Sequence, residues 1–230
     1  MKRAAGNSRE RVKKQILIVD DHPMVREGLA QLIAREPELA VCGEAGTAQE
    51  GLAKAAELKP DLILVDITLP GRSGLELIKD ILAIRPETRV LVVSMHEESL
   101  YAERVLRAGG RGYIMKQEGG RKLVEAIRQV LAGQVYVSPS MSARLLDSLS
   151  GARAQDARSP VEGLTDREFE IFRLIGEGLS TRDIAQKLHL SVKTIEVHRL
   201  NIKTKLKLAS SSELVHRAVR WMQAQTPGAV

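Results

Sequence analysis

Five side chains suited to phosphoryl chemistry stand in order along the first half of the chain. Asp20 and Asp21 are adjacent, and Asp66, Ser94 and Lys116 follow. Grouped carboxylates repel one another unless a hard cation lies between them, and Mg²⁺ fits because it binds one or two protein carboxylates while keeping waters and phosphate oxygens. A lysine ammonium and a serine hydroxyl suit the phosphoryl group itself. The set predicts a magnesium-dependent site in which Asp66 is the nucleophile and becomes an aspartyl phosphate.

Each of these residues ends or directly follows a short apolar run. The runs lie at residues 16–20 (ILIVD), 39–45 (LAVCGEA), 62–66 (LILVD), 90–94 (VLVVS) and 112–116 (GYIMK). Runs of Ile, Leu and Val are typical of parallel strands that are covered on both faces, and the segments between them have the length and periodicity of helices. We predict a doubly wound, five-stranded parallel α/β sheet, whose ligands bind beyond the carboxyl ends of the strands.

Each residue also has an ordinary structural alternative. A single aspartate after a strand is usually a turn or capping residue, so the prediction depends on the five residues occurring in order. His22 has three interpretations: a metal ligand, a second phosphoacceptor or, as its place before Pro23 favours, the residue that precedes a helix. The chain has five histidines. Their spacing is not that of metal ligands, which argues against a zinc site.

The five residues, taken in order, resemble the receiver domain of response regulators over residues 15–133. That family has an acidic pair after strand 1, an acceptor aspartate after strand 3, a serine or threonine after strand 4 and a lysine after strand 5. The segments DDHPMVREGL (20–29) and DITLPGRSG (66–74) are also typical of it. The resemblance implies a flavodoxin-like receiver fold for this part of the chain.

The resemblance also assigns roles to individual residues. It implies that Mg²⁺ is bound by Asp21, Asp66, the backbone carbonyl of Thr68 and, through water, Asp20. It further implies that Tyr113 is an aromatic switch that turns inward when Ser94 rotates toward the phosphate. A half-buried strand aromatic is the alternative interpretation of Tyr113.

The second half of the chain has a different pattern. Residues 134–163 are rich in Ser, Ala, Gly and Arg, and we interpret them as a linker with at most one short amphipathic piece at 141–149. A small all-α domain follows, whose helix starts are well specified: Thr165 opens a capping box, and Ser180 and Ser191 cap two further helices. Only two residues separate the second of these helices from the cap of the third. That is the spacing of a helix-turn-helix.

Residues 164–208 resemble the LuxR-type helix-turn-helix, and the two resemblances together place the chain in the NarL/FixJ class of response regulators. The residues of the third helix that are expected to pack inward are Ile195, Ile202 and Leu206. Its candidates for base edges are Lys193, Glu196 and Val197. Glu196 can accept a hydrogen bond from cytosine N4, and it stands where part of the family has lysine. Candidates for phosphate contacts are Ser180, Thr181, Ser191, Arg199, Lys203 and Lys205.

The distribution of charge matters more than its total. The net charge is +6, but residues 1–14 alone hold six basic residues against one glutamate. Between Ser180 and Lys207 there are seven Lys or Arg residues and only two acidic ones. A solvated basic face is the alternative, and the clustering around one capped helix favours contact with nucleic acid. The basic extension at 1–14 is either a functional arm or a disordered segment.

The last predicted helix runs from about Ser211 to residue 223. The resemblance implies that it forms the dimer, within a DNA-binding domain at 164–224 that leaves a tail at 225–230. Packing onto its own domain is the alternative, and Trp221 suits either role. His198, in the helix before it, is expected to pack toward the domain core.

Composition and targeting signals limit where the protein acts. No run of 18 or more apolar residues occurs, and no apolar segment follows the basic N-terminus. We therefore expect a cytoplasmic protein with no membrane partner. The one cysteine, Cys42, lies in an apolar stretch, and we interpret it as a buried structural thiol in a reducing compartment.

Taken together, the sequence predicts a DNA-binding transcriptional response regulator and not an enzyme. A sensor histidine kinase is expected to phosphorylate Asp66, and a homodimer is expected to bind double-stranded DNA. One rival is a phosphotransferase or phosphatase that uses Asp66 for turnover, although the chain lacks a second carboxylate two residues on, at Thr68. The other rival is a constitutive DNA-binding protein, against which the complete Asp, Ser and Lys set argues.

Overall fold

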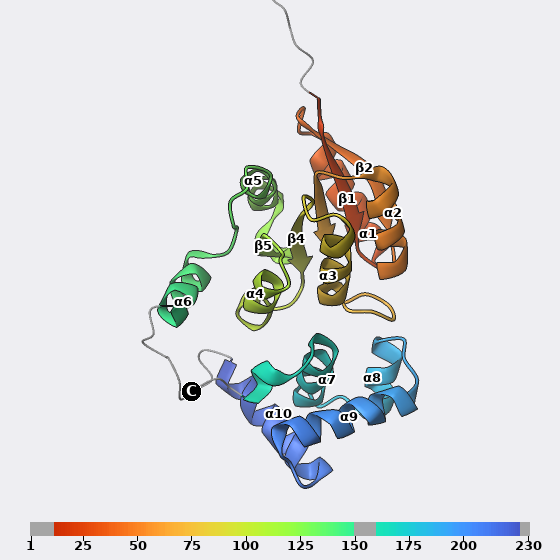
Figure 1. Cartoon of the computed structure of the whole chain (residues 1–230), viewed down its shortest axis with the longest axis vertical. Coiled ribbons are helices and arrows are strands. Elements are labelled where there is room, and N and C mark those ends of the chain that lie inside the picture. The colour runs from red at the N-terminus through yellow and green to blue at the C-terminus, as the bar shows by residue number, and fades with distance from the viewer. Residues whose placement is uncertain (1–11, 150–159, 226–230) are drawn as a thin grey trace, which may run out of the picture.

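The computed structural model describes residues 12–149 and 160–225, and its first half is the predicted α/β sheet (Figure 1). Five strands pair in parallel in the order β2-β1-β3-β4-β5. Their bounds are β1 Lys14–Val19, β2 Leu39–Ala45, β3 Leu62–Val65, β4 Arg89–Ser94 and β5 Gly112–Met115. The five predicted strands and the predicted fold class are confirmed. Most of the predicted extension at 1–14 and nearly all of the tail at 225–230 lie outside the described residues.

Helices cover both faces of this sheet. Their bounds are α1 Pro23–Ala34, α2 Ala48–Leu58, α3 Gly74–Ile84, α4 Glu98–Arg107 and α5 Gly120–Leu131. Ile16 and Ile18 of β1 pack with α1 and α5, while Leu17 and Val19 pack on the opposite face with α2, α3 and α4. Both faces of β1 are therefore buried, which explains its continuous run of apolar residues.

The turns that carry the chemical residues are fixed by local contacts. His22 is the residue before α1 and Pro23 is its first residue, as the sequence predicted. Ser73 caps α3, and Glu76 completes a capping box. A Cβ atom on Gly74 would lie 2.0 Å from the carbonyl oxygen of Asp66. Only glycine fits at this position, so Gly74 allows α3 to begin directly behind the loop that follows β3.

The segment that the sequence predicted as a linker begins as part of the first domain. Tyr136 forms a parallel bridge with Gly112, which extends the edge of the sheet beyond β5. Helix α6 follows at Pro139–Leu149, two residues longer at its start than the predicted amphipathic piece. Proline is favoured in the first turn of a helix, and the Ser138 hydroxyl accepts a hydrogen bond from the Met141 N–H at 3.1 Å. Met141 is buried, and α6 packs against α4.

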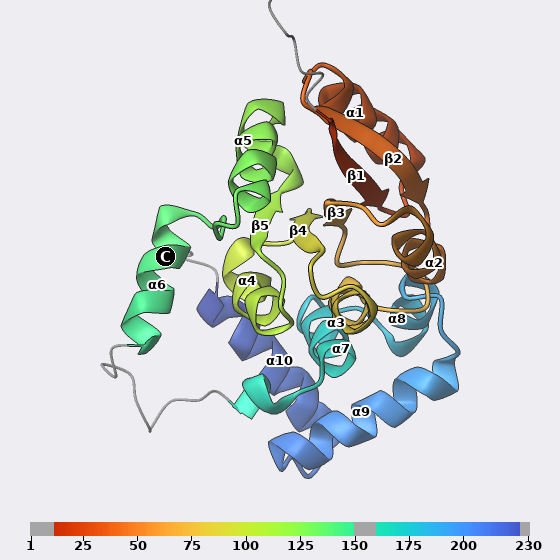
Figure 2. The ribbon, with the colours of Figure 1, turned by 45° about the horizontal axis from the view of Figure 1, so that its top comes forward.

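The second half of the chain is a helical domain. Its elements are the 3-10 turn η2 Pro160–Gly163 and the helices α7 Asp166–Gly176, α8 Thr181–Lys187, α9 Val192–Leu206 and α10 Ser211–Gln225. The predicted caps Thr165, Ser180 and Ser191 all accept backbone hydrogen bonds at the starts of their helices. Figures 1 and 2 both place α7 between the first domain and α9, which lies on the far side of the molecule.

Candidate phosphoryl site and nucleic-acid interface

The predicted phosphoryl residues meet at the carboxyl ends of the strands. Asp20 follows β1, Asp66 follows β3, and these strands are neighbours in the sheet. The Nζ atom of Lys116 lies 2.6 Å from Oδ2 of Asp20 and 2.7 Å from Oδ2 of Asp66. Asp20 and Asp66 are 2% and 5% exposed. The lysine therefore bridges two buried carboxylates, as residues at the same edge of a parallel sheet can.

The charges in this cluster are coupled. Burial raises the pKa of Asp66, and the positive charge of Lys116 offsets this only in part. Burial alone would lower the pKa of Lys116, but attraction to Asp66 and Asp20 outweighs it and the net shift is upward. Lys116 therefore stays a cation at neutral pH, available to pair with added negative charge.

The acidic residues also fit a hard cation. Ligand atoms of Asp20, Asp21, His22 and Asp66 lie within 4.8 Å of one another. Three of these four groups are carboxylates, the donors that Mg²⁺ prefers. His22 Nδ1 lies 2.6 Å from Oδ1 of Asp21 and so pairs with a carboxylate of the cluster. The Thr68 N–H is 3.4 Å from Oδ1 of Asp66, and binding of Mg²⁺ by the Thr68 carbonyl stays a prediction.

Ser94 and Tyr113 lie beside Asp66 with their side chains buried. Ser94 is 1% exposed, and its hydroxyl accepts a hydrogen bond of 3.4 Å from the His96 N–H. The Tyr113 ring is also 1% exposed, and its hydroxyl donates to the His96 carbonyl at 2.8 Å. The Tyr113 ring thus has the inward position that the sequence resemblance associates with rotation of Ser94, and the His96 carbonyl gives its buried hydroxyl a partner. A switching role for Tyr113 stays a prediction.

His96 was not among the predicted site residues, yet it connects two parts of the molecule. Its Nε2 is hydrogen-bonded to Oγ1 of Thr68 at 2.9 Å, two residues after Asp66. Its ring stacks on Tyr101 of α4 with 5.2 Å between centroids. Burial and the nearby charge of Arg173 lower the pKa of His96 to about 3. The imidazole is therefore neutral near physiological pH.

Tyr101 carries this connection into the helical domain. Its hydroxyl accepts a hydrogen bond of 2.9 Å from Nε of Arg173 in α7. The Tyr101 ring also meets Phe169 edge-on, with centroids 5.3 Å apart. Tyr101 and Arg173 are 0% and 3% exposed, and burial raises the pKa of Tyr101 to about 12. The hydroxyl stays protonated, and the Arg173 guanidinium also pairs with Glu177.

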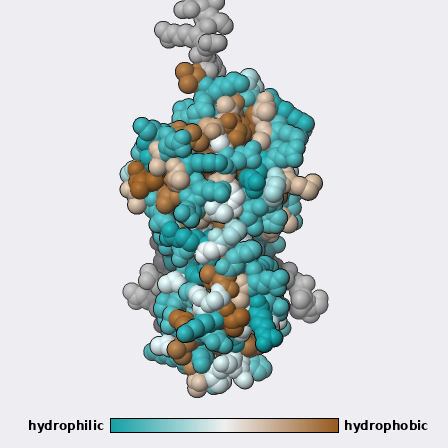
Figure 3. All heavy atoms as spheres, turned by 90° about the vertical axis from the view of Figure 1, so that its right-hand side faces the viewer, coloured by the Kyte–Doolittle hydropathy of each residue, from teal (hydrophilic) through white to brown (hydrophobic). Residues whose placement is uncertain are grey.

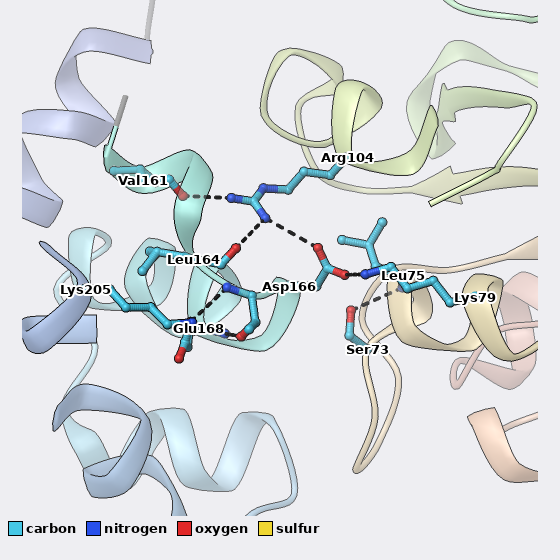
Figure 4. Close-up of polar contacts among 10 residues, drawn as sticks. Ser73, Leu75, Lys79, Arg104, Val161, Leu164, Asp166, Glu168 and Lys205 are labelled. Carbon is cyan, nitrogen blue, oxygen red and sulfur yellow. Dashed lines mark hydrogen bonds and ion pairs between the residues drawn. The ribbon is translucent and has the colours of Figure 1, made fainter. Parts of the chain in front are cut away.

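Asp166, the first residue of α7, contacts Arg104 of α4, and this pair joins the two domains (Figure 4). The Arg104 guanidinium donates to the carbonyls of Val161 and Leu164 at 2.8 and 3.0 Å, and lies 3.4 Å from Oδ1 of Asp166. Lys79 of α3 pairs with the other oxygen of Asp166 at 2.6 Å. One carboxylate thus joins α3 and α4 to the start of α7.

A second polar contact involves the loop that carries the phosphoacceptor. Gly71 lies in the segment 66–74, its N–H donates to the Leu188 carbonyl at 3.3 Å, and its carbonyl accepts from Arg167 at 2.6 Å. Arg167 also pairs with Glu170 at 2.5 Å, and both are buried. We call the contacts of Gly71, Lys79, Tyr101 and Arg104 with residues 161–188 the docking interface.

The predicted base-contacting residues lie on the opposite side of the helical domain from the docking interface. Lys193, Glu196 and Val197 are exposed on α9, while Ile195 and Ile202 are fully buried beneath them. His198 is half-buried, and burial lowers its pKa, which fits the predicted packing role.

The predicted phosphate-contacting residues flank this face. Arg199 and Lys203 are half-buried at its edge, and Ser180, Thr181 and Ser191 lie at the starts of α8 and α9. Lys205 differs from these residues because its ammonium is 2.6 Å from Oε2 of Glu168 in α7, with 40% of its side chain exposed. The pairing follows from the capping box of α7, which turns the Glu168 carboxylate toward α9. A phosphate contact by Lys205 stays a prediction.

The sequence left two roles open for Trp221 and predicted a buried structural thiol for Cys42. Trp221 of α10 meets Phe169 and Phe172 edge-on, at centroid distances of 5.4 and 5.8 Å, so it packs within its own domain. Cys42 is half-buried in β2, and burial raises the pKa of its thiol, which fits a packing role.

Among residues 12–149 and 160–225, no helix is both long and apolar enough to cross a bilayer.

Family comparisons match both halves of the chain. Residues 16–128 match the response regulator receiver domain, and residues 162–218 match the bacterial regulatory proteins of the luxR family. Among curated proteins, the response regulator GacA of Pseudomonas aeruginosa is 39% identical over 206 residues, covering 90% of this chain and 95% of that protein. The oxygen regulatory protein NreC of Staphylococcus carnosus is 36% identical over 210 residues, covering 90% and 97%.

Solved structures agree with this match. A LuxR-family response regulator from Aurantimonas is 37% identical and covers 60% of this chain, with a TM-score of 0.56. RcsB from Salmonella enterica serovar Typhimurium, bound to the promoter rprA with a phosphomimetic, is 26% identical. It covers 90% of this chain and 98% of its own, with a TM-score of 0.60.

Proposed function

Because the chain belongs to the response regulators that join a receiver domain to a LuxR-type DNA-binding domain, we propose that phosphorylation of Asp66 controls its binding to DNA. One observation carries the proposal: the Asp66 carboxylate lies 2.7 Å from the Lys116 ammonium, beside the acidic pair, in a chain whose other domain is a helix-turn-helix. The family is one of transcription regulators, so the chemistry at Asp66 serves as a signal.

The chemical step is the transfer of a phosphoryl group. An oxygen of Asp66 attacks the phosphorus of a phosphohistidine in a sensor kinase; the new P–O bond forms as the P–N bond breaks, and the electron pair leaves with the imidazole, which takes up a proton. Lys116 balances the added charge, and Ser94 supplies a hydroxyl donor. Mg²⁺ bound by Asp21 and Asp66, with Asp20 through water and the Thr68 carbonyl, would neutralise the transferring oxygens.

The coupling to DNA is proposed to run through the docking interface. Asp66 and Gly71 share one loop, and Gly71 bonds to Arg167 and Leu188 of the helical domain. A second route leads from Thr68 through His96 and Tyr101 to Arg173. New charge at Asp66 would shift both, together with Ser94 and Tyr113, and so change how firmly the domains are docked.

The proposed DNA contacts follow from the exposed side of α9. Lys193, Glu196 and Val197 face base edges, and the phosphate contacts are made by Arg199 and Lys203 with the capped starts of α8 and α9. A homodimer would align two copies of α9 on half-sites about one DNA turn apart. RcsB dimers bound to DNA support this assembly by analogy. A cytoplasmic location is proposed on the same grounds, since both the kinase phosphodonor and the DNA are inside the cell.

The test is DNA binding at fixed salt, before and after incubation with acetyl phosphate and Mg²⁺. Duplexes enriched from a random library by the treated wild-type chain serve as ligands. Treatment is expected to tighten wild-type binding about 5- to 150-fold, which corresponds to a typical coupling free energy of 1–3 kcal/mol. Asp66→Ala is expected to take up no phosphate and to bind equally in both conditions.

Asp61→Ala provides the matched control. Asp61 directly precedes β3, at the end of the strand opposite to Asp66, and pairs with Lys14 at the surface. This variant should therefore respond like the wild type. Phosphate uptake by Asp66→Ala at the wild-type rate would reject the site. Equal wild-type affinities after confirmed phosphorylation would reject the coupling and leave the site standing.

A further inference from the structure

Helix α9 presents apolar side chains on its outer face. Val197 and Leu200 are 52% and 57% exposed, while Ile195 and Ile202 on the inner face are fully buried. Lys193, Val197 and Leu200 follow one another at steps of four and three residues, so they share one face of the helix. Leu200 lies on this face one turn beyond the predicted base-contacting residues.

Nothing within the described part of the chain covers these two side chains. The receiver docks on the α7 side, and both ribbon views place α9 away from it (Figure 2). Apolar residues also gather among polar ones on the surface of the lower, helical half of the molecule (Figure 3). A single exposed apolar residue is ordinary, but this pair lies between the cations of Lys193 and Lys203. Glu196 is the one acidic residue of α9, so the charge around the pair is net positive and complementary to a polyanion.

We infer that Leu200, together with Val197, is a specificity-determining residue that selects thymine through its C5 methyl group. The inference rests on the proposed function, because it requires the outer face of α9 to lie in the major groove. There, thymine alone presents a methyl group, and apolar side chains contact it. A leucine offers no hydrogen bond to the other base edges, so their donors or acceptors would lose water without gaining a partner.

The test removes only the methyl group. Duplexes are enriched from a random library with the wild-type chain after acetyl phosphate and Mg²⁺ treatment, and each thymine is then replaced in turn by deoxyuracil. At one or more positions wild-type affinity is expected to fall about fourfold, the value of one buried methyl-sized group. Leu200→Ala is expected to bind the thymine and deoxyuracil duplexes equally at that position.

Leu146→Ala is the matched control, because Leu146 of α6 is 65% exposed and lies in the other half of the molecule. It should keep the full wild-type sensitivity to deoxyuracil. Equal sensitivity of the wild type and Leu200→Ala, or no sensitivity at any thymine, would overturn the inference. A second copy of the chain is the alternative partner of Val197 and Leu200. In that case Leu200→Ala should self-associate more weakly without DNA, and deoxyuracil should not change the affinity at any position. That result would overturn the inference as well.

Failure of this inference is distinguishable from failure of the proposed function. If Lys193→Ala weakens binding while deoxyuracil has no effect, α9 still contacts DNA and only the thymine selectivity is rejected. If the wild-type chain enriches no duplex, or Lys193→Ala and Leu200→Ala both bind like the wild type, the proposed DNA contact is rejected and the inference with it.

Discussion

The two sides of the helical domain differ in what they cover and what they leave exposed. On the α7 side, Arg167, Glu170 and Arg173 are 5%, 1% and 3% exposed, because the receiver lies over them. On the α9 side, Val197 and Leu200 are 52% and 57% exposed. Charged residues are thus buried where the domains meet, while apolar residues face solvent. This is the reverse of the usual arrangement of a protein surface.

This difference between the α7 side and the α9 side constrains how phosphorylation would control DNA binding. In this conformation docking does not cover the outer face of α9, so a change in docking cannot act by uncovering it. Docking instead fixes the direction in which α9 points relative to the receiver. Two copies of α9 must be aligned to meet half-sites one turn apart, and a clamped domain has less freedom to align. Breaking the docking interface should therefore affect assembly on DNA while leaving α9 itself unchanged.

The largest effect is expected from Arg104→Ala. Its guanidinium binds two backbone carbonyls and Asp166, and lies 4.1 Å above the centre of the Phe169 ring, with 14% of the side chain exposed. Removing it should weaken docking by about 3 kcal/mol, or about a hundredfold. Small-angle scattering should report a larger radius of gyration.

The control for Arg104→Ala lies on the same helix. Arg107 is 56% exposed, and its ion pair with Glu162 is long, at 3.8 Å. Arg107→Ala should therefore leave the scattering curve unchanged. A compact Arg104→Ala chain would mean that the apolar contacts of the docking interface hold the domains together without this clamp.

A smaller effect is expected from Tyr101→Phe. The variant keeps the ring packed on His96 and Phe169 and removes only the acceptor of the Arg173 hydrogen bond. A buried donor without its partner costs about 1–3 kcal/mol, and this donor is charged. The unfolding midpoint in urea should fall accordingly. Tyr136→Phe, at a partly exposed ring, should not change it; equal shifts in the two variants would contradict a special role for the Tyr101 hydroxyl.

The folded chain should also lose stability in mild acid. His96 has its pKa lowered from 6.5 to about 3, by burial and by the cations Arg173, Lys187 and Lys116. Between pH 6.5 and pH 3, the imidazole of His96 is protonated in the unfolded chain and neutral in the folded chain. The folded state therefore loses stability as the pH falls below about 6.5. From pH 7 to pH 5 the loss should be about 1–2 kcal/mol.

His96→Gln isolates this contribution. It should flatten the decline of the unfolding free energy between pH 7 and pH 5, while the wild-type slope should persist in His216→Gln, since His216 is exposed. The half-buried His198 titrates in all three chains, so it cancels in the comparison. An unchanged slope in His96→Gln would show that His96 is not the group responsible.

The features that could be predicted from sequence depend on neighbours in the chain or on strand ends. Thr165, Ser180 and Ser191 cap their helices through N–H groups three residues on, so the sequence contains both partners. Asp66 and Lys116 are far apart in sequence, but each directly follows a strand. Parallel strands end at one edge, which brings such residues together without further information.

The docking interface could not be predicted, because its pattern resembles that of a solvated surface. Arg167, Glu170 and Arg173 recur every three residues along α7, as charged residues on an exposed helical face do. What buries them comes from distant sequence: Tyr101 is 72 positions before its partner Arg173. His96 gave no signal either, since a histidine two residues after a strand end has many ordinary roles. Their role in joining the two domains becomes visible only in the packed structure.

The smallest effect is expected at the second cation on Asp166. Lys79 lies closer to this carboxylate than Arg104 does, at 2.6 Å against 3.4 Å, but its side chain is 57% exposed. Solvent screening and side-chain entropy limit such pairs to about 0–1 kcal/mol. Lys79→Ala should therefore weaken docking by less than about fivefold and leave scattering at physiological salt unaltered. An effect as large as that of Arg104→Ala would mean that charge at Asp166, rather than the buried hydrogen bonds of the guanidinium, holds the domains together, and raising the salt concentration should then open the wild-type chain.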